Sequence, residues 1–113
     1  MIVSATRTFI GDFNASLKDV SATSLAMAVM DSSIQRAGIE KRSVEQMIMG
    51  NCFERLDQNV ARIAAVKCGL PLETPGFTLV VNCASGMQAM ICGPQARRFA
   101  SLFHPGDCHV PAQ

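Results

Sequence analysis

The stretch FTLVVNCASG, residues 77–86, decides the fold class. Its first half, Phe77–Val81, is a continuous apolar run of strand length that is rich in β-branched residues. Such a run is typical of a strand covered on both faces. A helix is expected from Met87 to about Phe99, so Cys83 is predicted to lie in a strand-to-helix turn. Open α/β sheets bind their ligands outside such turns.

Towards the N-terminus, segments with strand and helix patterns alternate. The best-bounded helix is predicted at Ala22–Ala37, because Ser21 can cap its first turn and Gly38 can adopt the left-handed conformation that ends a helix. The other expected elements are a first or edge strand at Ile2–Ala5, a turn or helical stub at Lys41–Glu45, a buried strand within Gln46–Phe53, and a helix at Asn59–Cys68 closed by Gly69. This alternation predicts an α/β fold with a wholly or partly parallel sheet and helices over its faces.

Composition bounds the class of protein. The chain has 113 residues, of which 49% are apolar and 17% charged, so it is one domain or a large part of one and not a disordered chain. A net charge of +1 gives no reason to expect nucleic acid as a partner. No apolar run is long enough to span a membrane, and the N-terminus does not resemble a signal peptide. We therefore expect a cytoplasmic protein, or one from an organelle whose targeting segment is missing.

The cysteines favour neither a disulfide framework nor a zinc site. There are five of them, an odd number, and none forms a CxxC pair. They are Cys52, Cys68, Cys83, Cys92 and Cys108. His104, Cys108 and His109 make half a metal site without a second pair of ligands. We expect no bound metal, and we expect most of the cysteines to behave as small buried apolar residues.

Cys83 has a setting that suits a nucleophile. A helix N-terminus carries partial positive charge and unpaired N–H groups, which stabilise a thiolate. The same groups can hold the oxyanion that forms when a thiolate attacks a carbonyl. Ser85 and Gly86 are small, so a ligand can approach the backbone of the turn. The turn indicates either a cysteine nucleophile for acyl transfer or a buried cysteine at a tight turn.

Several segments resemble thiolases, and they do so in the family's order from residue 2 to about residue 96. VNCASGMQAM, residues 81–90, resembles the active-site cysteine segment of that family. The other matching segments are IVSATRTFIG at 2–11, SLKDVSATSLA at 16–26, RAGI at 36–39, IMGN at 48–51 and QNVAR at 58–62. The resemblance implies a layered thiolase-like α/β fold, present as a partial N-terminal half with a mixed, partly parallel sheet and covering helices. It also implies a thiolase N-terminal domain at 1–96 and a divergent tail at 97–113.

The resemblance implies an acyltransferase that joins two acyl-CoA molecules into a 3-ketoacyl-CoA and CoA, or runs the reverse thiolysis. Cys83 would hold the acyl group as a thioester. No cofactor is implied, since CoA thioesters are substrate and product, and a homo-oligomer, a dimer or tetramer, is implied as the assembly. Arg7, Lys18 and Arg62 could meet CoA phosphates, although such charges usually lie on solvated surface. Asn59 either supports the active-site loop or caps the second helix.

Some features depart from the family. Phe9 and Val60 stand where the family usually has proline, and Pro94 is expected to kink the third helix. The family's CoA-holding loop, its histidine base and its second cysteine lie in later segments, which the tail 97–113 does not match. We therefore expect an inactive N-terminal fragment. The alternatives are a non-catalytic truncated or splice product that needs a partner chain, and a thiol-based redox or metal protein.

Overall fold

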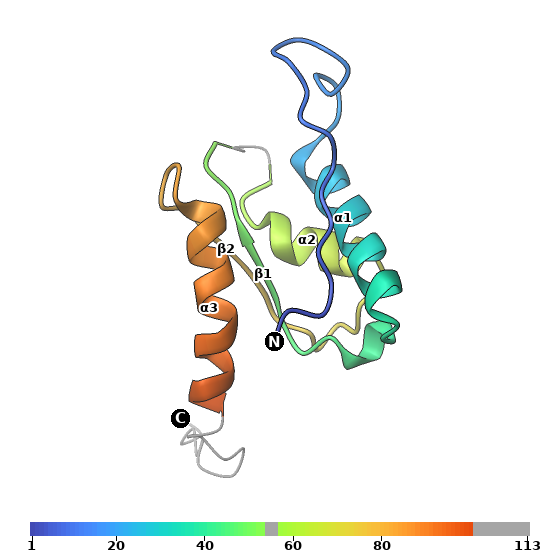
Figure 1. Cartoon of the computed structure of the whole chain (residues 1–113), viewed down its shortest axis with the longest axis vertical. Coiled ribbons are helices and arrows are strands. Elements are labelled where there is room, and N and C mark those ends of the chain that lie inside the picture. The colour runs from blue at the N-terminus through green and yellow to red at the C-terminus, as the bar shows by residue number, and fades with distance from the viewer. Residues whose placement is uncertain (54–56, 101–113) are drawn as a thin grey trace, which may run out of the picture.

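The computed structural model describes residues 1–53 and 57–100, with side chains up to residue 96. Within this range the elements follow one another as helix, 3-10 turn, strand, helix, strand and helix (Figure 1). Their bounds are α1 at Ala22–Ala37, the 3-10 turn at Lys41–Ser43, β1 at Met47–Gly50, α2 at Val60–Lys67, β2 at Gly76–Leu79 and α3 at Ser85–Ala100. The predicted α/β class is confirmed.

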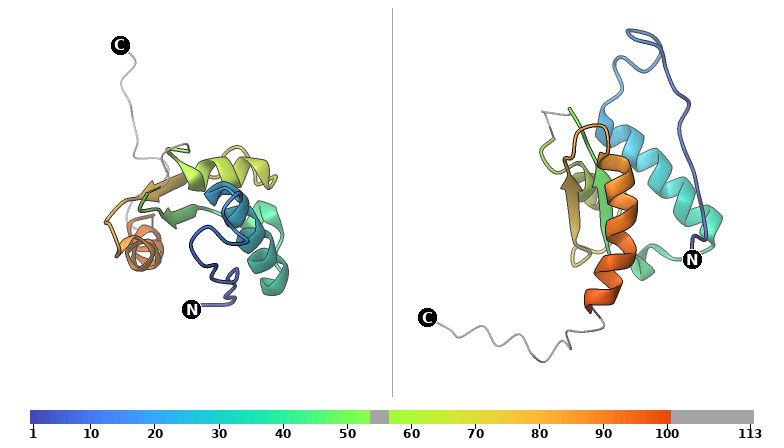
Figure 2. Two further views of the ribbon diagram at one scale, coloured as in Figure 1. Left: turned by 90° about the horizontal axis from the view of Figure 1, so that it is seen from above. Right: turned by 60° about the vertical axis from the view of Figure 1, so that its left-hand side comes forward.

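The two strands of the described sheet pair in parallel, from Met47 opposite Gly76 to Gly50 opposite Leu79. Helix α3 lies against one face of this sheet, and α2 lies against the other with α1 packed beyond it (Figures 1 and 2). Because successive side chains of a strand point to opposite faces, Met47 and Met49 face α2, whereas Gly50 faces α3. The predicted parallel sheet with covering helices is therefore present.

Local capping signals set the ends of α1 as the sequence predicts. The side chain of Ser21 accepts the N–H of Ser24 at 3.1 Å, which satisfies one donor of the first turn. Gly38 has a φ of 64°, and its N–H donates to the carbonyl of Gln35. The main core lies between α1 and α2. Its buried residues are Ala26, Met30, Val60, Ala64, Ala65, Cys68 and Leu70.

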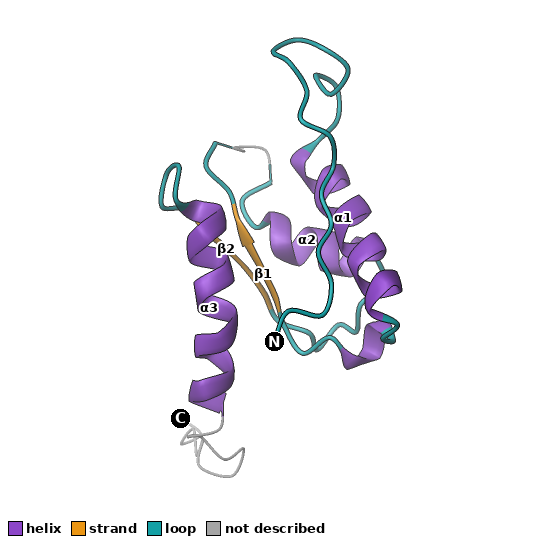
Figure 3. Cartoon of the chain, in the orientation of Figure 1, coloured by secondary structure: helices purple, strands orange, loops and turns teal. Residues whose placement is uncertain are grey.

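The predicted strand at Ile2–Ala5 is wrong, because this segment has no strand partner in the described part of the chain (Figure 3). It runs along α1 instead. The hydroxyl of Thr6 donates to the carbonyl of Val29 at 2.9 Å, and Arg36 donates to the carbonyl of Ala5 at 3.4 Å. Hydrogen bonds to a helix therefore replace the expected strand pairing.

Two bounds around Cys83 also differ from the prediction. The strand begins one residue early and ends at Leu79, and Val80 and Val81 are 65% and 49% exposed instead of covered on both faces. Helix α3 begins at Ser85, two residues before the predicted start. Helix α3 continues through residues 97–100, which the sequence assigned to the divergent tail. The predicted domain boundary at residue 96 stays a prediction. Residues 101–113 of the predicted tail lie outside the described residues. None of the described helices is long and apolar enough to cross a bilayer.

Candidate active site at the Cys83 turn

Cys83 lies in the short connection between the end of β2 and the start of α3, as the sequence predicts. Its side chain is exposed, and its thiol is free. Both β1 and β2 end at this edge of the sheet, because they run in parallel. The alternative of a buried cysteine at a tight turn is therefore wrong.

Hydrogen bonds hold the turn from within. Asn82 has a φ of 49°, in the left-handed region that a side chain seldom adopts. Its carbonyl accepts the N–H of Ser85 at 3.1 Å and the hydroxyl of the same residue at 2.7 Å. The Ser85 oxygen in turn accepts the N–H of Val81 at 2.9 Å, and Ser85 is only 4% exposed. A buried hydroxyl thus bridges the two ends of the connection that carries Cys83.

The first turn of α3 leaves two backbone donors beside this connection. The first helical hydrogen bond runs from the N–H of Gln88 to the carbonyl of Ala84, at 2.9 Å. The N–H groups of Gly86 and Met87 have no hydrogen-bond acceptor among the described residues. Unpaired donors at a helix N-terminus favour negative charge. They suit both a thiolate and the oxyanion of an acyl-transfer intermediate.

Gly50 is the residue of this region that the sequence analysis missed. A methyl group placed on Gly50 would lie less than 3.0 Å from backbone atoms of Ser85 and Gly86. The absence of a side chain therefore lets the start of α3 rest directly on the end of β1. A glycine that closes an apolar strand run is the signal that could have found it, since such a glycine often marks close approach of another backbone segment.

Asn59 and Arg62 make hydrogen bonds that stabilise the fold, and for Asn59 the predicted capping of the second helix is confirmed. Asn59 caps α2, because its Oδ1 accepts the N–H of Arg62 at 3.2 Å. The guanidinium of Arg62 donates to the carbonyls of Thr74 and Leu72, at 2.7 and 2.9 Å, and so ties α2 to the connection before β2. Of the other two candidate phosphate contacts, Arg7 donates to the carbonyl of Thr8 at 3.0 Å, and Lys18 is exposed.

The remaining described cysteines have different surroundings. Cys68 is 6% exposed, and its thiol lies 3.7 Å from a carboxylate oxygen of Asp31. Burial raises the pKa of the Cys68 thiol, with the Asp31 charge adding to the effect. Cys52 and Cys92 are half-buried, and Cys92 accepts a hydrogen bond from Gln88 at 3.6 Å. Cys108, His104 and His109 lie outside the described residues.

An α/β domain that presents an exposed cysteine at the N-terminus of a helix is one known setting of acyl-transfer enzymes. The family model "Thiolase, N-terminal domain" matches residues 1–99. The chain therefore belongs to the thiolase family, whose N-terminal portion it represents.

Relatives of known name agree with this assignment. The chain is 43% identical over 97 residues to the acetyl-CoA acetyltransferase of Escherichia coli, a match that covers 85% of this chain and 25% of that protein. It is 41% identical over 97 residues to the mitochondrial acetyl-CoA acetyltransferase of Homo sapiens, covering 85% of this chain and 23% of the relative. The chain thus spans about a quarter of the length of these relatives.

Solved structures give the same result for the fold. A thiolase from Ascaris suum, solved in complex with coenzyme A, superposes with a TM-score of 0.81 at 31% identity, covering 87% of this chain and 26% of that one. The acetyl-CoA acetyltransferase of Bacillus anthracis superposes with a TM-score of 0.77 at 39% identity, covering 81% and 24%. The described layers are therefore those of the N-terminal part of thiolase structures.

Proposed function

We propose that this chain is the part of a thiolase-type acyltransferase that carries the acyl-accepting cysteine, Cys83. One observation carries the proposal: the exposed thiol lies next to a helix start whose Gly86 and Met87 N–H groups have no acceptor in the described part of the chain. Membership of the thiolase family supports the same assignment. The complete reaction would convert two acyl-CoA molecules to a 3-ketoacyl-CoA and CoA, or run in reverse by thiolysis.

In the first half-reaction, the Cys83 thiolate attacks the carbonyl carbon of an acyl-CoA. A carbon–sulfur bond forms, and the negative charge moves to the carbonyl oxygen, where backbone N–H groups can stabilise it. Collapse of this intermediate breaks the bond between the carbonyl carbon and the CoA sulfur. The CoA thiolate leaves and takes a proton, and the acyl group stays on Cys83 as a thioester. CoA thioesters are the substrates and CoA a product, as the family's chemistry requires.

The experiment that tests this role is acylation by acetyl-CoA followed by mass spectrometry. The purified chain is incubated with excess acetyl-CoA, digested at mildly acidic pH and searched for an acetyl thioester that hydroxylamine removes. We expect the thioester on Cys83, its loss in Cys83→Ala, and its retention in the matched control Cys92→Ala. Equal acetylation of several cysteines, or no acetylation of a Cys83 that iodoacetamide still alkylates, contradicts the proposal.

Complete turnover is not expected from these 113 residues. The cycle needs one group that takes the thiol proton and a second that moves a proton at the substrate carbon, and each contributes about 10²–10⁴-fold. By the family resemblance, both groups belong to segments beyond the matched quarter of the relatives. Release of CoA over many turnovers from a 3-ketoacyl-CoA, abolished by Cys83→Ala, would contradict this expectation.

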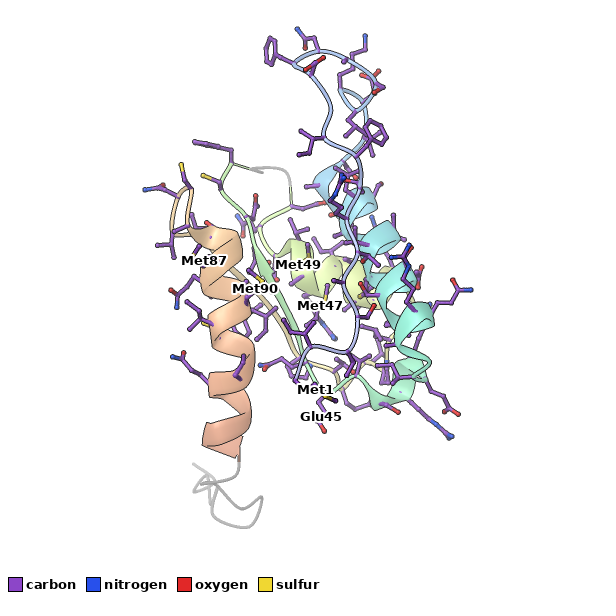
Figure 4. The ribbon with its side chains drawn as sticks, in the orientation of Figure 1. Met1, Glu45, Met47, Met49, Met87 and Met90 are labelled. Carbon is purple, nitrogen blue, oxygen red and sulfur yellow. The ribbon has the colours of Figure 1, made fainter. Side chains whose placement is uncertain are left out.

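A second candidate is a non-catalytic chain that folds or acts only with a partner chain. One surface observation favours it: α3, on which Figure 4 labels Met87 and Met90, leaves Met87, Met90 and Ile91 exposed by 66%, 69% and 46%. Apolar side chains at this helical spacing suit burial against another surface, either in a homo-oligomer or in a longer chain. The named relatives are bacterial or mitochondrial, so the compartment we propose is the cytoplasm or the mitochondrion.

A further inference from the structure

The end of β1 and the start of α3 meet without any side chain between them. A methyl group on Gly50 would lie within 3.0 Å of the backbone atoms of Ser85 and Gly86, a separation that real Cβ atoms essentially never show. The contact is therefore between backbone and backbone. Any side chain at position 50 requires the first turn of α3 to move away from the strand.

The same two residues of α3 control the connection that carries Cys83. Ser85 is 4% exposed, and its hydroxyl joins the N–H of Val81 at 2.9 Å to the carbonyl of Asn82 at 2.7 Å. Gly86 supplies one of the unpaired N–H groups of the helix start. A displacement of this helical turn thus changes both the shape of the connection that carries Cys83 and the position of the unpaired donors next to it in the chain.

We propose that Gly50 and Ser85 are positioning residues for Cys83. The absence of a side chain at Gly50 lets the start of α3 pack directly on β1, and the Ser85 hydroxyl holds the connection that carries Cys83 to this first turn of α3. Neither residue touches the substrate in this role. The inference rests on the proposed function, since it explains how the acyl-accepting thiol is held beside the donors of α3. In this role β1, which is distant from Cys83 in the sequence, helps to set the reactivity of the turn.

The expected effect is a loss of Cys83 reactivity without loss of the fold. When the helix start moves, the Cys83 thiolate loses stabilisation, and the rate of its alkylation near neutral pH falls on the order of threefold to tenfold. A mutation that only loosens the fold acts in the opposite direction on a buried thiol, because Cys68 becomes exposed and reacts faster.

The experiment measures the alkylation rate of each cysteine by iodoacetamide near neutral pH, with peptide mapping. The variants are Gly50→Ala and Ser85→Ala. Gly93→Ala is the matched control for the first, because a methyl group at Gly93 meets nothing within 4 Å. Ser32→Ala is the control for the second, since Ser32 is exposed on α1.

We expect both variants to slow the alkylation of Cys83 while Cys68 stays protected, and both controls to match the original chain. An unchanged rate of Cys83 alkylation in a folded variant overturns the proposal. So does a joint rise in the reactivity of Cys68, which would show that the contact only supports the fold. If Gly50→Ala does not fold, Ser85→Ala decides by the same criteria.

Acetylation by acetyl-CoA separates this inference from the proposed function. If Cys83 of the original chain is not acetylated but its alkylation rate still depends on Gly50 and Ser85, the positioning stands and the acyltransferase role fails. If Cys83 is acetylated equally well in the original chain, Gly50→Ala and Ser85→Ala, the acyltransferase role stands and the positioning fails.

Discussion

Replacing Asn59 by alanine tests how firmly α2 is tied to the sheet below the candidate site. Its Oδ1 accepts the N–H of Arg62 at 3.2 Å and the hydroxyl of Thr78 at 2.9 Å, and its Nδ2 donates to the carbonyl of Gly76 at 3.0 Å. Loss of an N-cap side chain costs about 1 kcal/mol. Each of the other two hydrogen bonds contributes about 0.5–1.5 kcal/mol. We therefore expect Asn59→Ala to lower the free energy of unfolding by about 2–4 kcal/mol.

Two measurements follow this loss. Urea unfolding monitored by far-UV circular dichroism gives the change in the free energy of unfolding directly. Alkylation of the buried Cys68 thiol measures the same loss independently. The protection of this thiol against alkylation falls about tenfold for each 1.4 kcal/mol by which the free energy of opening decreases. This second assay reads the contact between α1 and α2, since the Cys68 sulfur lies 3.8 Å from the carbonyl of Met27.

Asn59→Asp is the control, because it keeps the acceptor oxygen and replaces the amide donor by a carboxylate oxygen. We expect it to cost about 1 kcal/mol, as for the one hydrogen bond to the Gly76 carbonyl. A change of less than about 0.5 kcal/mol for Asn59→Ala, which is the usual range of surface substitutions, would refute the reasoning. It would show that the cap and the hydrogen bonds to β2 stabilise the folded chain no more than hydrogen bonds to water would.

Three further predictions concern the thiols, the assembly and the pH dependence. Brief alkylation near neutral pH is expected to label Cys83 first, and preferential labelling of Cys52, Cys68, Cys92 or Cys108 would contradict its special setting. Size-exclusion chromatography is expected to show dimers or larger species, because α3 exposes an apolar side; a sharply melting monomer at high concentration would argue against this. The free energy of unfolding is expected to fall as the pH rises above about 8.5. The reason is that burial raises the pKa of Cys68, so the folded chain holds the thiol proton more tightly than the unfolded chain does. The free energy of unfolding of Cys68→Ala should fall less steeply with pH.

Local signals account for what the sequence predicts correctly. The bounds of α1 are confirmed because Ser21 and Gly38 act within one turn of the helix ends. The start of α2 is set by the Asn59 cap in the same way. Cys83 falls between a strand and a helix because the apolar run of β2 stops close to it and the helix-forming residues follow. Each of these features depends on residues that are neighbours in the chain.

Non-local contacts account for what the sequence analysis misses. The strand pattern of Ile2–Ala5 is satisfied against α1 and not at a sheet edge, and no local pattern distinguishes these two partners. Val80 and Val81 have the β-branched side chains of a buried strand, yet pairing with β1 ends at Leu79. The apolar pattern predicts burial wherever a partner exists, and in this chain the partner strand is only four residues long.

On the proposed role of Cys83, its reactivity depends on more than its own motif. The left-handed conformation of Asn82, with a φ of 49°, is one that asparagine tolerates better than most residues, and the surroundings hold it in place. Two constraints do so: the Ser85 hydroxyl draws the ends of the connection together, and the contact of Gly50 with α3 fixes where the helix begins. A chain with the same residues 81–86 but a larger residue at position 50 would keep the motif and shift the helix start that the thiol depends on. If Cys83 has the proposed role, the functional unit is the end of β1 together with the turn, and a search for such sites should require both.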